Sequence, residues 1–188
     1  MNKTKRIIFD SAVKEFSECG YSGATMDDIA LKAGVAKGTL YYHFKSKEEI
    51  FKFVVIEGIK TLQGELASIN ETGLGSLDKI RKICKNQLTL IYENTEFFKV
   101  LISQLWGEES RQLEIRIELS KYFLEIEKVI KIAMNEGIIK QGNSSLMAFT
   151  FFGSMVSTAV YEMLNKDKVS VNEVVDQVLE ISLKGILK

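Results

Sequence analysis

The sequence is poor in the residues that break helices, cross-link chains or bind metals. Its 188 residues include no proline, two cysteines and one histidine. Without proline, breaks between helices fall to glycine and asparagine, and most of the 13 glycines lie between segments of helical periodicity. Cys19 and Cys84 are too few for a disulfide framework and lack C-x-x-C spacing, which favours a reducing cytoplasm. A lone histidine provides no metal cluster and no catalytic base beside a nucleophile, so we expect no metal, no cofactor and no enzymatic activity.

The chain also lacks net charge. Its 25 basic and 25 acidic residues cancel, so the total gives no sign of a nucleic acid or membrane partner. Asp10 and Glu15 interrupt the N-terminal segment before any long apolar run, which argues against a secretion signal. One charge-free segment of 21 residues, 141–161, is long enough to cross a bilayer. Its scattered Asn, Ser and Thr side chains favour a helix buried at a subunit interface instead, so we expect a cytoplasmic protein without membrane contact.

Apolar residues recur at intervals of three and four along most of the chain, which predicts an all-α fold of about nine helices. A first helix is expected to end near Gly20, and two short helices follow, over residues 25–33 and 37–44. A boundary at Ser46 divides a three-helix domain, residues 1–46, from a larger helical bundle, residues 47–188. Helices of the bundle are expected over residues 46–70, 76–92, 95–106, 110–136 and 144–164, and from residue 171 onward.

The two short helices have the parts of a helix-turn-helix, in which the second helix enters the major groove of DNA. Thr25 and Asp28 form a T-x-x-D pattern that is typical of a helix N-terminus. Gly34 lies where the chain must reverse within three residues, so we expect a positive φ there. Leu40 and Phe44, four residues apart, are predicted to face the core.

Residues 29–47 carry a local positive charge that the zero net charge of the whole chain conceals. This segment holds four lysines and His43 but no acidic residue. The lysines are Lys32, Lys37, Lys45 and Lys47. Such a patch is the electrostatic footprint of DNA binding, although Lys32 is expected to be ordinary solvated surface. Residues 51–188, with 17 basic and 18 acidic side chains, offer no second basic surface.

Residues 25–47, TMDDIALKAGVAKGTLYYHFKSK, resemble the DNA-binding signature of the tetracycline-repressor (TetR) family. The matching positions are Thr25, Ile29-Ala30, Ala33-Gly34-Val35, Lys37-Gly38-Thr39-Leu40-Tyr41, His43-Phe44, Lys45 and Lys47. The likeness covers the first quarter of the chain; beyond that it is architectural, including two final helices similar to the family's dimerisation pair. Ala36 departs from the pattern, because the family often has a capping Ser or Thr there, and its loss should cost about 1 kcal/mol of local stability.

The matching positions and the chemistry of their side chains imply a set of DNA contacts. Phosphate contacts are expected from Thr25, Tyr42, His43 and Lys47. Candidates for contact with base edges are Lys37, Thr39 and Tyr41, and Gly38 lets the helix approach the groove closely. The adjacent tyrosines 41 and 42 cannot both face the core, and an exposed aromatic side chain beside lysines favours DNA contact.

The last two helices carry more apolar surface than one chain needs, which predicts a homodimer. The predicted interface residues are Phe149, Gly153, Val156, Ser157, Val160, Val175 and Leu179. A dimer also meets a physical need, because two recognition helices read a palindromic operator whose half-sites lie about 34 Å, or a multiple of it, apart.

A ligand pocket is predicted among the aromatic residues of the bundle. Its expected lining is Phe98, Ile102, Trp106, Tyr122 and Phe152. The resemblance implies that a small hydrophobic effector binds there, shifts the helix that begins at Ser46 and changes the distance between recognition helices, which releases a repressor from its operator.

Two alternatives to a DNA-binding repressor are considered. An enzyme lacks support, because the single histidine lies in the DNA motif. A helical protein-interaction or small-molecule-binding module without DNA binding stays open, but it leaves the acid-free face of lysine, tyrosine and histidine unexplained. A steep loss of DNA affinity with added salt separates these alternatives.

Overall fold

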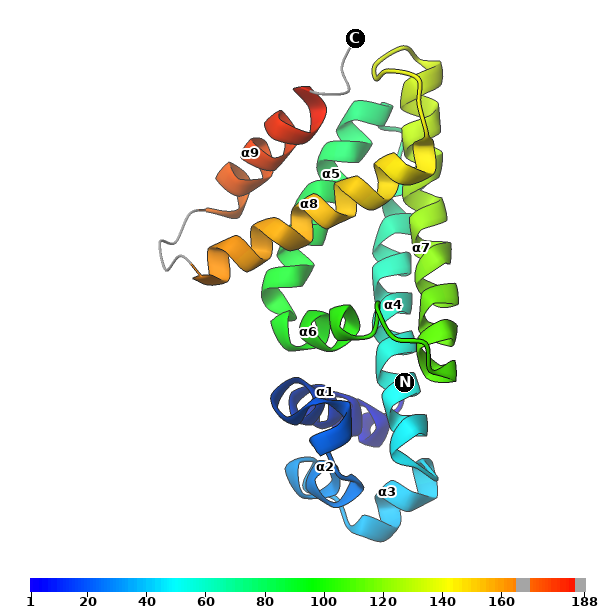
Figure 1. Ribbon diagram of the computed structural model, residues 1–188, viewed down its shortest axis with the longest axis vertical. Helices are drawn as coiled ribbons and strands as arrows, with labels where there is room; N and C mark the ends of the chain where they lie inside the picture. The colour runs from blue at the N-terminus through cyan, green and yellow to red at the C-terminus, as the bar shows by residue number, and fades with distance from the viewer. Residues whose placement is uncertain (165–169, 185–188) are drawn as a thin grey trace. The chain divides into compact units, whose positions relative to one another are not determined.

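The protein is described by a computed structural model, in which residues 1–164 and 170–184 are placed and form nine α-helices. The helices are α1 (Lys3–Gly23), α2 (Met26–Lys32), α3 (Lys37–His43), α4 (Lys47–Asn70), α5 (Ser76–Glu93), α6 (Thr95–Ser103), α7 (Ser110–Asn135), α8 (Ser144–Leu164) and α9 (Val171–Lys184). Figure 1 shows them in chain order. The all-α prediction and the number of helices are confirmed over these residues.

The predicted helix boundaries agree closely with the structure because the local capping signals are used. Glu49 donates its backbone N–H to the Ser46 hydroxyl over 3.1 Å, and Ser170 and Glu173 bond to each other reciprocally at the start of α9. Helix α6 is shorter than predicted and ends at Ser103 rather than 106, because the next residues close i→i+3 turns onto Leu101 and Ile102.

Two glycines adopt the left-handed backbone conformation that the turns of the N-terminal segment require. Gly34 has φ 63°, as predicted, and lies between α2 and α3. Gly20 has φ 67° and interrupts α1, so the regular helix ends where the sequence predicts and one further turn follows it. Any side chain at either position would be strained, because L-residues rarely adopt this conformation.

The first of two compact units consists of residues 1–60 and 94–118. It therefore contains α1 to α3, the first part of α4, α6 and the start of α7, with α6 packed on α1. A Cβ atom at Gly58 would lie 2.1 Å from the Phe97 ring, so α4 and α6 approach more closely than any side chain at residue 58 allows.

The second unit contains residues 61–93 and, from 119 onward, the rest of the described chain. Helix α5 packs against both α8 and α9, and α8 packs against α9, as their neighbouring ribbons show (Figure 1). Its core includes the fully buried side chains of Leu88, Tyr122 and Met155. Helices α4 and α7 each contribute residues to both units.

Helix α8 is unusually apolar for its exposure. Within the described chain it is the one helix whose length and composition would allow it to cross a membrane, over Ser144–Tyr161, yet only 28% of that window is buried. Hydrophobic side chains that a single chain leaves uncovered suit contact with a second apolar surface.

A candidate DNA-binding surface on helix α3

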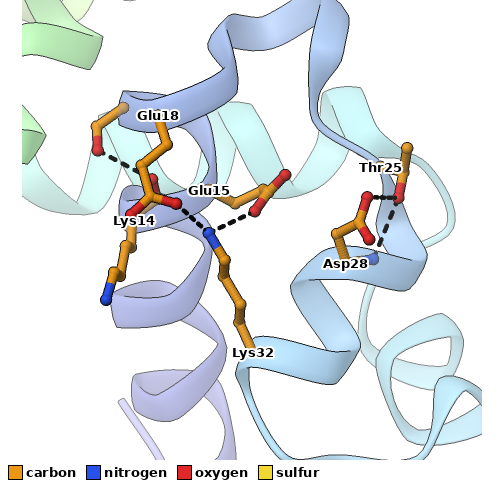
Figure 2. A network of polar contacts seen from close by, with 7 residues as sticks. Lys14, Glu15, Glu18, Thr25, Asp28 and Lys32 are labelled. Atoms are coloured by element: carbon orange, nitrogen blue, oxygen red, sulfur yellow. Dashed lines mark hydrogen bonds and ion pairs between the residues drawn. The ribbon is translucent and has the colours of Figure 1, made fainter.

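The N-terminus of α2 is fixed by the predicted Thr25 cap. The Thr25 hydroxyl accepts a hydrogen bond from the backbone N–H of Asp28 over 3.1 Å and donates to the Asp28 carboxylate over 2.5 Å (Figure 2). The carboxylates of Asp27 and Asp28 lie in the first turn, where they interact favourably with the positive end of the helix dipole. This turn sets the direction of α2 and, through the Gly34 turn, also the direction of α3.

An ion cluster joins α2 to α1. Figure 2 shows the Lys32 ammonium between two carboxylates of α1, bonded to Glu18 and 2.7 Å from an oxygen of Glu15, whose side chain is only 4% exposed. These hydrogen bonds raise the pKa of Lys32, and the bond from Lys32 lowers the pKa of Glu18. The expectation that Lys32 is ordinary solvated surface is therefore wrong, because the fold places its charge against a buried carboxylate that needs a partner.

Helix α3 has one buried face and one exposed face. Leu40 and Phe44 are buried in the core, as predicted, at 0% and 3% exposure. Tyr42 is 78% exposed and Tyr41 is 44% exposed, so both tyrosines leave the core. A Cβ at Gly38 would meet no atom within 4 Å, so this residue also faces open space. Thr39 and His43 lie at the edge of the exposed face, partly covered.

The start of α3 has no side-chain cap, as the sequence predicts. Ala36 occupies the N-cap position and makes no side-chain hydrogen bond. Beside this uncapped start, the Lys37 ammonium lies 2.6 Å from the Asp27 carboxylate of α2, and this bond raises the pKa of Lys37. Asp27 is outside the acid-free segment in sequence but next to it in space, so the positive charge of this face is smaller than the sequence suggests.

Lys47 is held by the turn that precedes α2. Its ammonium donates to the backbone carbonyls of Ser22 and Ala24 over 3.2 and 2.9 Å, and it lies 4.8 Å from the centre of the Tyr21 ring. A phosphate contact by Lys47 stays a prediction, and it requires the ammonium to share its three donors between these carbonyls and DNA.

The predicted dimer residues fall into two groups. On α8, the side chains of Phe149 and Val160 are 49% and 48% exposed, Ser157 is exposed, and Gly153 and Val156 are partly covered. On α9, Val175 and Leu179 are each only 3% exposed and pack inside the second unit. Helix α8 therefore carries a run of exposed apolar residues, which also includes Leu146, Tyr161 and Leu164, although Ile181 of α9 is exposed as well.

The predicted pocket residues are divided between the units. Tyr122 and Phe152 belong to the second unit, where their rings meet edge to face at 5.9 Å. Phe98, Ile102 and Trp106 belong to the first: Phe98 is buried, Ile102 is partly covered and Trp106 is 87% exposed. The second unit also holds a cavity of about 30 Å³, lined by Ile80, Ile83, Ile126, Val129, Ile130, Ile139, Met147, Phe151, Ser182 and Leu183. None of these residues is in the lining expected from the sequence.

Comparison with known proteins identifies the chain. Residues 8–54, which span α1 to the start of α4, match the family described as bacterial regulatory proteins, tetR family. The structure of a Clostridium perfringens protein assigned as a fatty acid metabolism regulator is 43% identical and superposes with a TM-score of 0.90, over 97% of this chain and 99% of that one. The chain belongs to the TetR family. It is therefore a DNA-binding transcriptional regulator that acts on double-stranded DNA as a homodimer.

In two comparisons, Bacillus subtilis regulators are similar to this chain over nearly its whole length. The fatty acid metabolism regulator protein of strain 168 is 28% identical over 195 residues, which cover 95% of this chain and 93% of that protein. The transcriptional regulator FadR, solved in complex with stearoyl-CoA, is 25% identical with a TM-score of 0.80, over 96% and 98% of the two chains. These TetR-family relatives are transcriptional regulators and not enzymes, and regulators of this family are soluble. The exposed stripe of α8 is thus an apolar surface on a soluble protein.

Proposed function

We propose that this TetR-family regulator is a cytoplasmic repressor that binds a palindromic operator through the exposed face of α3 and leaves it when a long-chain acyl thioester binds. The observation that carries the DNA-binding part is the pair of tyrosines on α3, both outside the core and flanked by Lys37 and Lys45. Large aromatic side chains beside cations are suited to DNA, whose phosphates attract the cations and whose grooves accept the rings.

The proposed DNA contacts are those expected from the sequence. Phosphates are held by Thr25, Tyr42, His43 and Lys47, and base edges are read by Lys37, Thr39 and Tyr41, with Gly38 allowing close approach. The open space around Gly38 and the high exposure of Tyr42 support this assignment. Lys37 must leave Asp27 or share its ammonium with a base, which makes that contact conditional on the DNA sequence.

The proposed dimer interface follows the exposed stripe of α8. Phe149, Gly153, Val156, Ser157 and Val160 recur at intervals of three and four, and the small residues at 153 and 157 allow two helices to approach closely. Val175 and Leu179 support the interface from beneath, because they fix α9 against its own unit. The functional division that we propose is residues 1–46 for DNA binding and 47–188 for sensing and dimerisation.

Two observations support a long-chain acyl effector. One relative is named for fatty acid metabolism at 43% identity, and another was crystallised with stearoyl-CoA. In this chain, Tyr122 and Phe152 lie in the apolar interior of the second unit. Its cavity of about 30 Å³ is far below the roughly 300–1,000 Å³ of ordinary ligand pockets, so an acyl chain must move the helices apart to enter. Binding that requires such movement is coupled to the shape of the protein.

A buried polar pair gives the proposed effector site a place for one polar group. Tyr122 and Gln87 are 0% and 2% exposed, and neither the Tyr122 hydroxyl nor the Gln87 Oε1 has a hydrogen-bond partner among the described residues. Burial raises the pKa of Tyr122, and the nearby Gln87 side chain acts in the opposite direction. The Tyr122 hydroxyl and the Gln87 amide nevertheless do not form a hydrogen bond of ordinary geometry. The neutral phenol is a hydrogen-bond donor for a thioester carbonyl.

The test uses a DNA duplex selected from a random library by the wild-type protein. Fluorescence anisotropy should show an affinity that falls steeply with salt, because phosphate contacts release counterions. Added stearoyl-CoA should weaken binding by about 5-fold to 150-fold, the usual range of allosteric coupling, whereas coenzyme A without the chain should not. Failure to select any duplex would contradict the DNA-binding role. Selected DNA that stearoyl-CoA does not release would contradict only the effector.

A further inference from the structure

Tyr21 lies at the point where α1 is interrupted, directly before the helix-turn-helix, and two cations lie over its ring. The guanidinium carbon of Arg111 is 3.9 Å from the ring centre, and the Lys47 ammonium is 4.8 Å from it. The ring also meets Phe51 edge-on, with ring centres 5.0 Å apart. Tyr21 thus contacts residues of both α4 and α7, although these three helices are far apart in sequence.

Arg111 is a buried cation with few ordinary partners. Its side chain is 11% exposed, and its Nε has no hydrogen-bond partner among the described residues. One terminal nitrogen pairs with Glu109, a residue whose own side chain is 65% exposed. A guanidinium removed from water in this way needs compensation, and the face of an aromatic ring at 3.9 Å provides it.

The turn that Tyr21 begins determines where α2 starts. The carbonyls of Ser22 and Ala24 accept hydrogen bonds from Lys47, and the Ala24 N–H closes the turn onto Gly20 over 3.2 Å. The next residue is Thr25, the N-cap of α2. Arg111 and Lys47 therefore hold, through one ring and two carbonyls, the turn from which the helix-turn-helix departs.

We propose that Arg111 is a positioning residue for DNA binding, which fixes the turn before α2 by its contact with Tyr21 and transmits movement of α7 to it. This inference rests on the proposed repressor function. Helix α7 is continuous from Ser110 to Asn135, and Tyr122, in the proposed effector site, is on the same helix. Eleven residues separate the two positions, about 16 Å along a helix. An effector that displaces α7 therefore acts directly on the Arg111–Tyr21 contact, without a separate linker.

The experiment compares variants of this contact in the full chain, with the selected duplex described above. Arg111→Met removes the charge at similar length, and Arg111→Lys keeps it; Tyr21→Leu removes the aromatic face, and Tyr21→Phe keeps it. Arg116→Met is the matched control, because Arg116 is on the same helix but donates to the carbonyls of Leu105 and Gly107 and does not contact Tyr21.

Arg111→Met and Tyr21→Leu should each weaken DNA binding by about 10-fold, and the double variant should be no weaker than either single one. The salt dependence should keep its slope, because no phosphate contact is lost. The conservative variants and Arg116→Met should bind almost as the wild type does. The weakening by stearoyl-CoA should shrink in Arg111→Met and persist in Arg116→Met, which a purely structural role for Arg111 would not produce.

Several outcomes would overturn the inference. Wild-type DNA affinity in Arg111→Met would show that the contact does not position the turn. A salt slope lowered by about one per subunit would show that Arg111 binds phosphate itself. If Arg111→Met does not fold, as judged by circular dichroism, the Tyr21→Leu and Tyr21→Phe pair decides in its place, and equal affinity of these two contradicts the proposal. If the wild-type protein itself does not bind DNA, that result would instead contradict the proposed function.

Discussion

Helices α3 and α8 both expose large apolar or aromatic side chains, but their surroundings differ. On α3, Tyr41 and Tyr42 lie outside the core between Lys37 and Lys45. On α8, the exposed residues Leu146, Phe149, Val160 and Tyr161 lie in a segment that contains no charged residue from 141 to 161. The exposed fraction of an aromatic side chain alone therefore does not identify its partner.

The neighbouring charges decide which partner each face suits. An aromatic ring beside lysines can approach a polyanion, because the cations replace its counterions. A charge-free apolar stripe with two small residues suits a second apolar helix, because it buries area without leaving an unpaired charge. The proposed DNA binding by α3 and the proposed dimerisation through α8 should thus be separable, and one substitution should disrupt each.

The largest effect is expected from a charge in the α8 stripe. Val160→Glu places one carboxylate on each side of a twofold interface, so two unpaired charges must be buried together. The dimer dissociation constant, measured by analytical ultracentrifugation, should rise at least about 100-fold. Ile132→Glu is the matched control, because Ile132 is an apolar residue of α7 with 46% exposure, close to the 48% of Val160. Equal dimerisation of the two variants would show that α8 does not form the interface.

A smaller effect, confined to DNA, is expected from the most exposed aromatic residue of α3. Tyr42→Ala should weaken binding to the selected duplex by about 10-fold, while the thermal unfolding midpoint stays within a few degrees of the wild type, because the side chain is 78% exposed. Tyr161→Ala, at 60% exposure on α8, should affect dimerisation instead. The comparison between the two helices fails if Tyr161→Ala alters DNA affinity at saturating dimer concentration.

Lys47→Ala tests whether one cation serves both the turn and DNA. If Lys47 contacts a phosphate, the plot of log affinity against log salt should flatten by roughly one unit per subunit, and binding to all sequences should weaken. If the ammonium only bridges the carbonyls of Ser22 and Ala24, affinity should fall with the slope unchanged. Titrations of the wild type and the variant at four salt concentrations distinguish the two results.

The smallest effect concerns the inner side of the second unit, where α5 packs against α8. Burial raises the pKa of the Cys84 thiol to about 12, from an ordinary value near 9. Because the folded-state pKa is the higher one, this contribution to stability is complete below about pH 9 and is lost as the pH rises towards 12. The unfolding free energy should fall more steeply over this range than in Cys84→Ala, by at most about 1.4 kcal/mol per pH unit.

Thiol labelling provides the control for this pH effect. Cys19 is exposed and Cys84 is buried, so a thiol reagent should modify Cys19 at once and Cys84 only on unfolding. Rapid labelling of both thiols in the native protein would mean that the interior behind α8 is open to the reagent. The contrast between the exposed and the buried side of α8 would then not hold.

Local signals in the sequence predicted the helices well. Capping at Thr25, Ser46 and Ser170 depends on residues three apart, so the chain specifies these starts without tertiary contacts. The positive φ of Gly34 and the burial of Leu40 and Phe44 follow from the same short-range patterns. The end of α6 was predicted three residues too late, because a helix C-terminus without a glycine has no comparable local signal.

Contacts between distant residues were not predictable in the same way. Lys32 looked solvated because its partners, Glu15 and Glu18, precede it by 17 and 14 residues in another helix. The acid-free segment looked fully positive because Asp27 is outside it in sequence, although it lies beside Lys37 in space. Arg111 carried no signal at all, since Tyr21 is 90 residues away.

The sequence by itself determined the nine described helices, the helix-turn-helix and the exposed basic and aromatic face of α3, because periodicity, capping and residue spacing act within a few turns of chain. Only the tertiary structure decided that Val175 and Leu179 of α9 are buried while Phe149 and Val160 of α8 stay exposed, and that Lys47 and Arg111 meet at Tyr21. The physical reason is that ion pairs, cation–π contacts and buried faces depend on which helices pack together, and no pattern along the chain encodes that pairing directly.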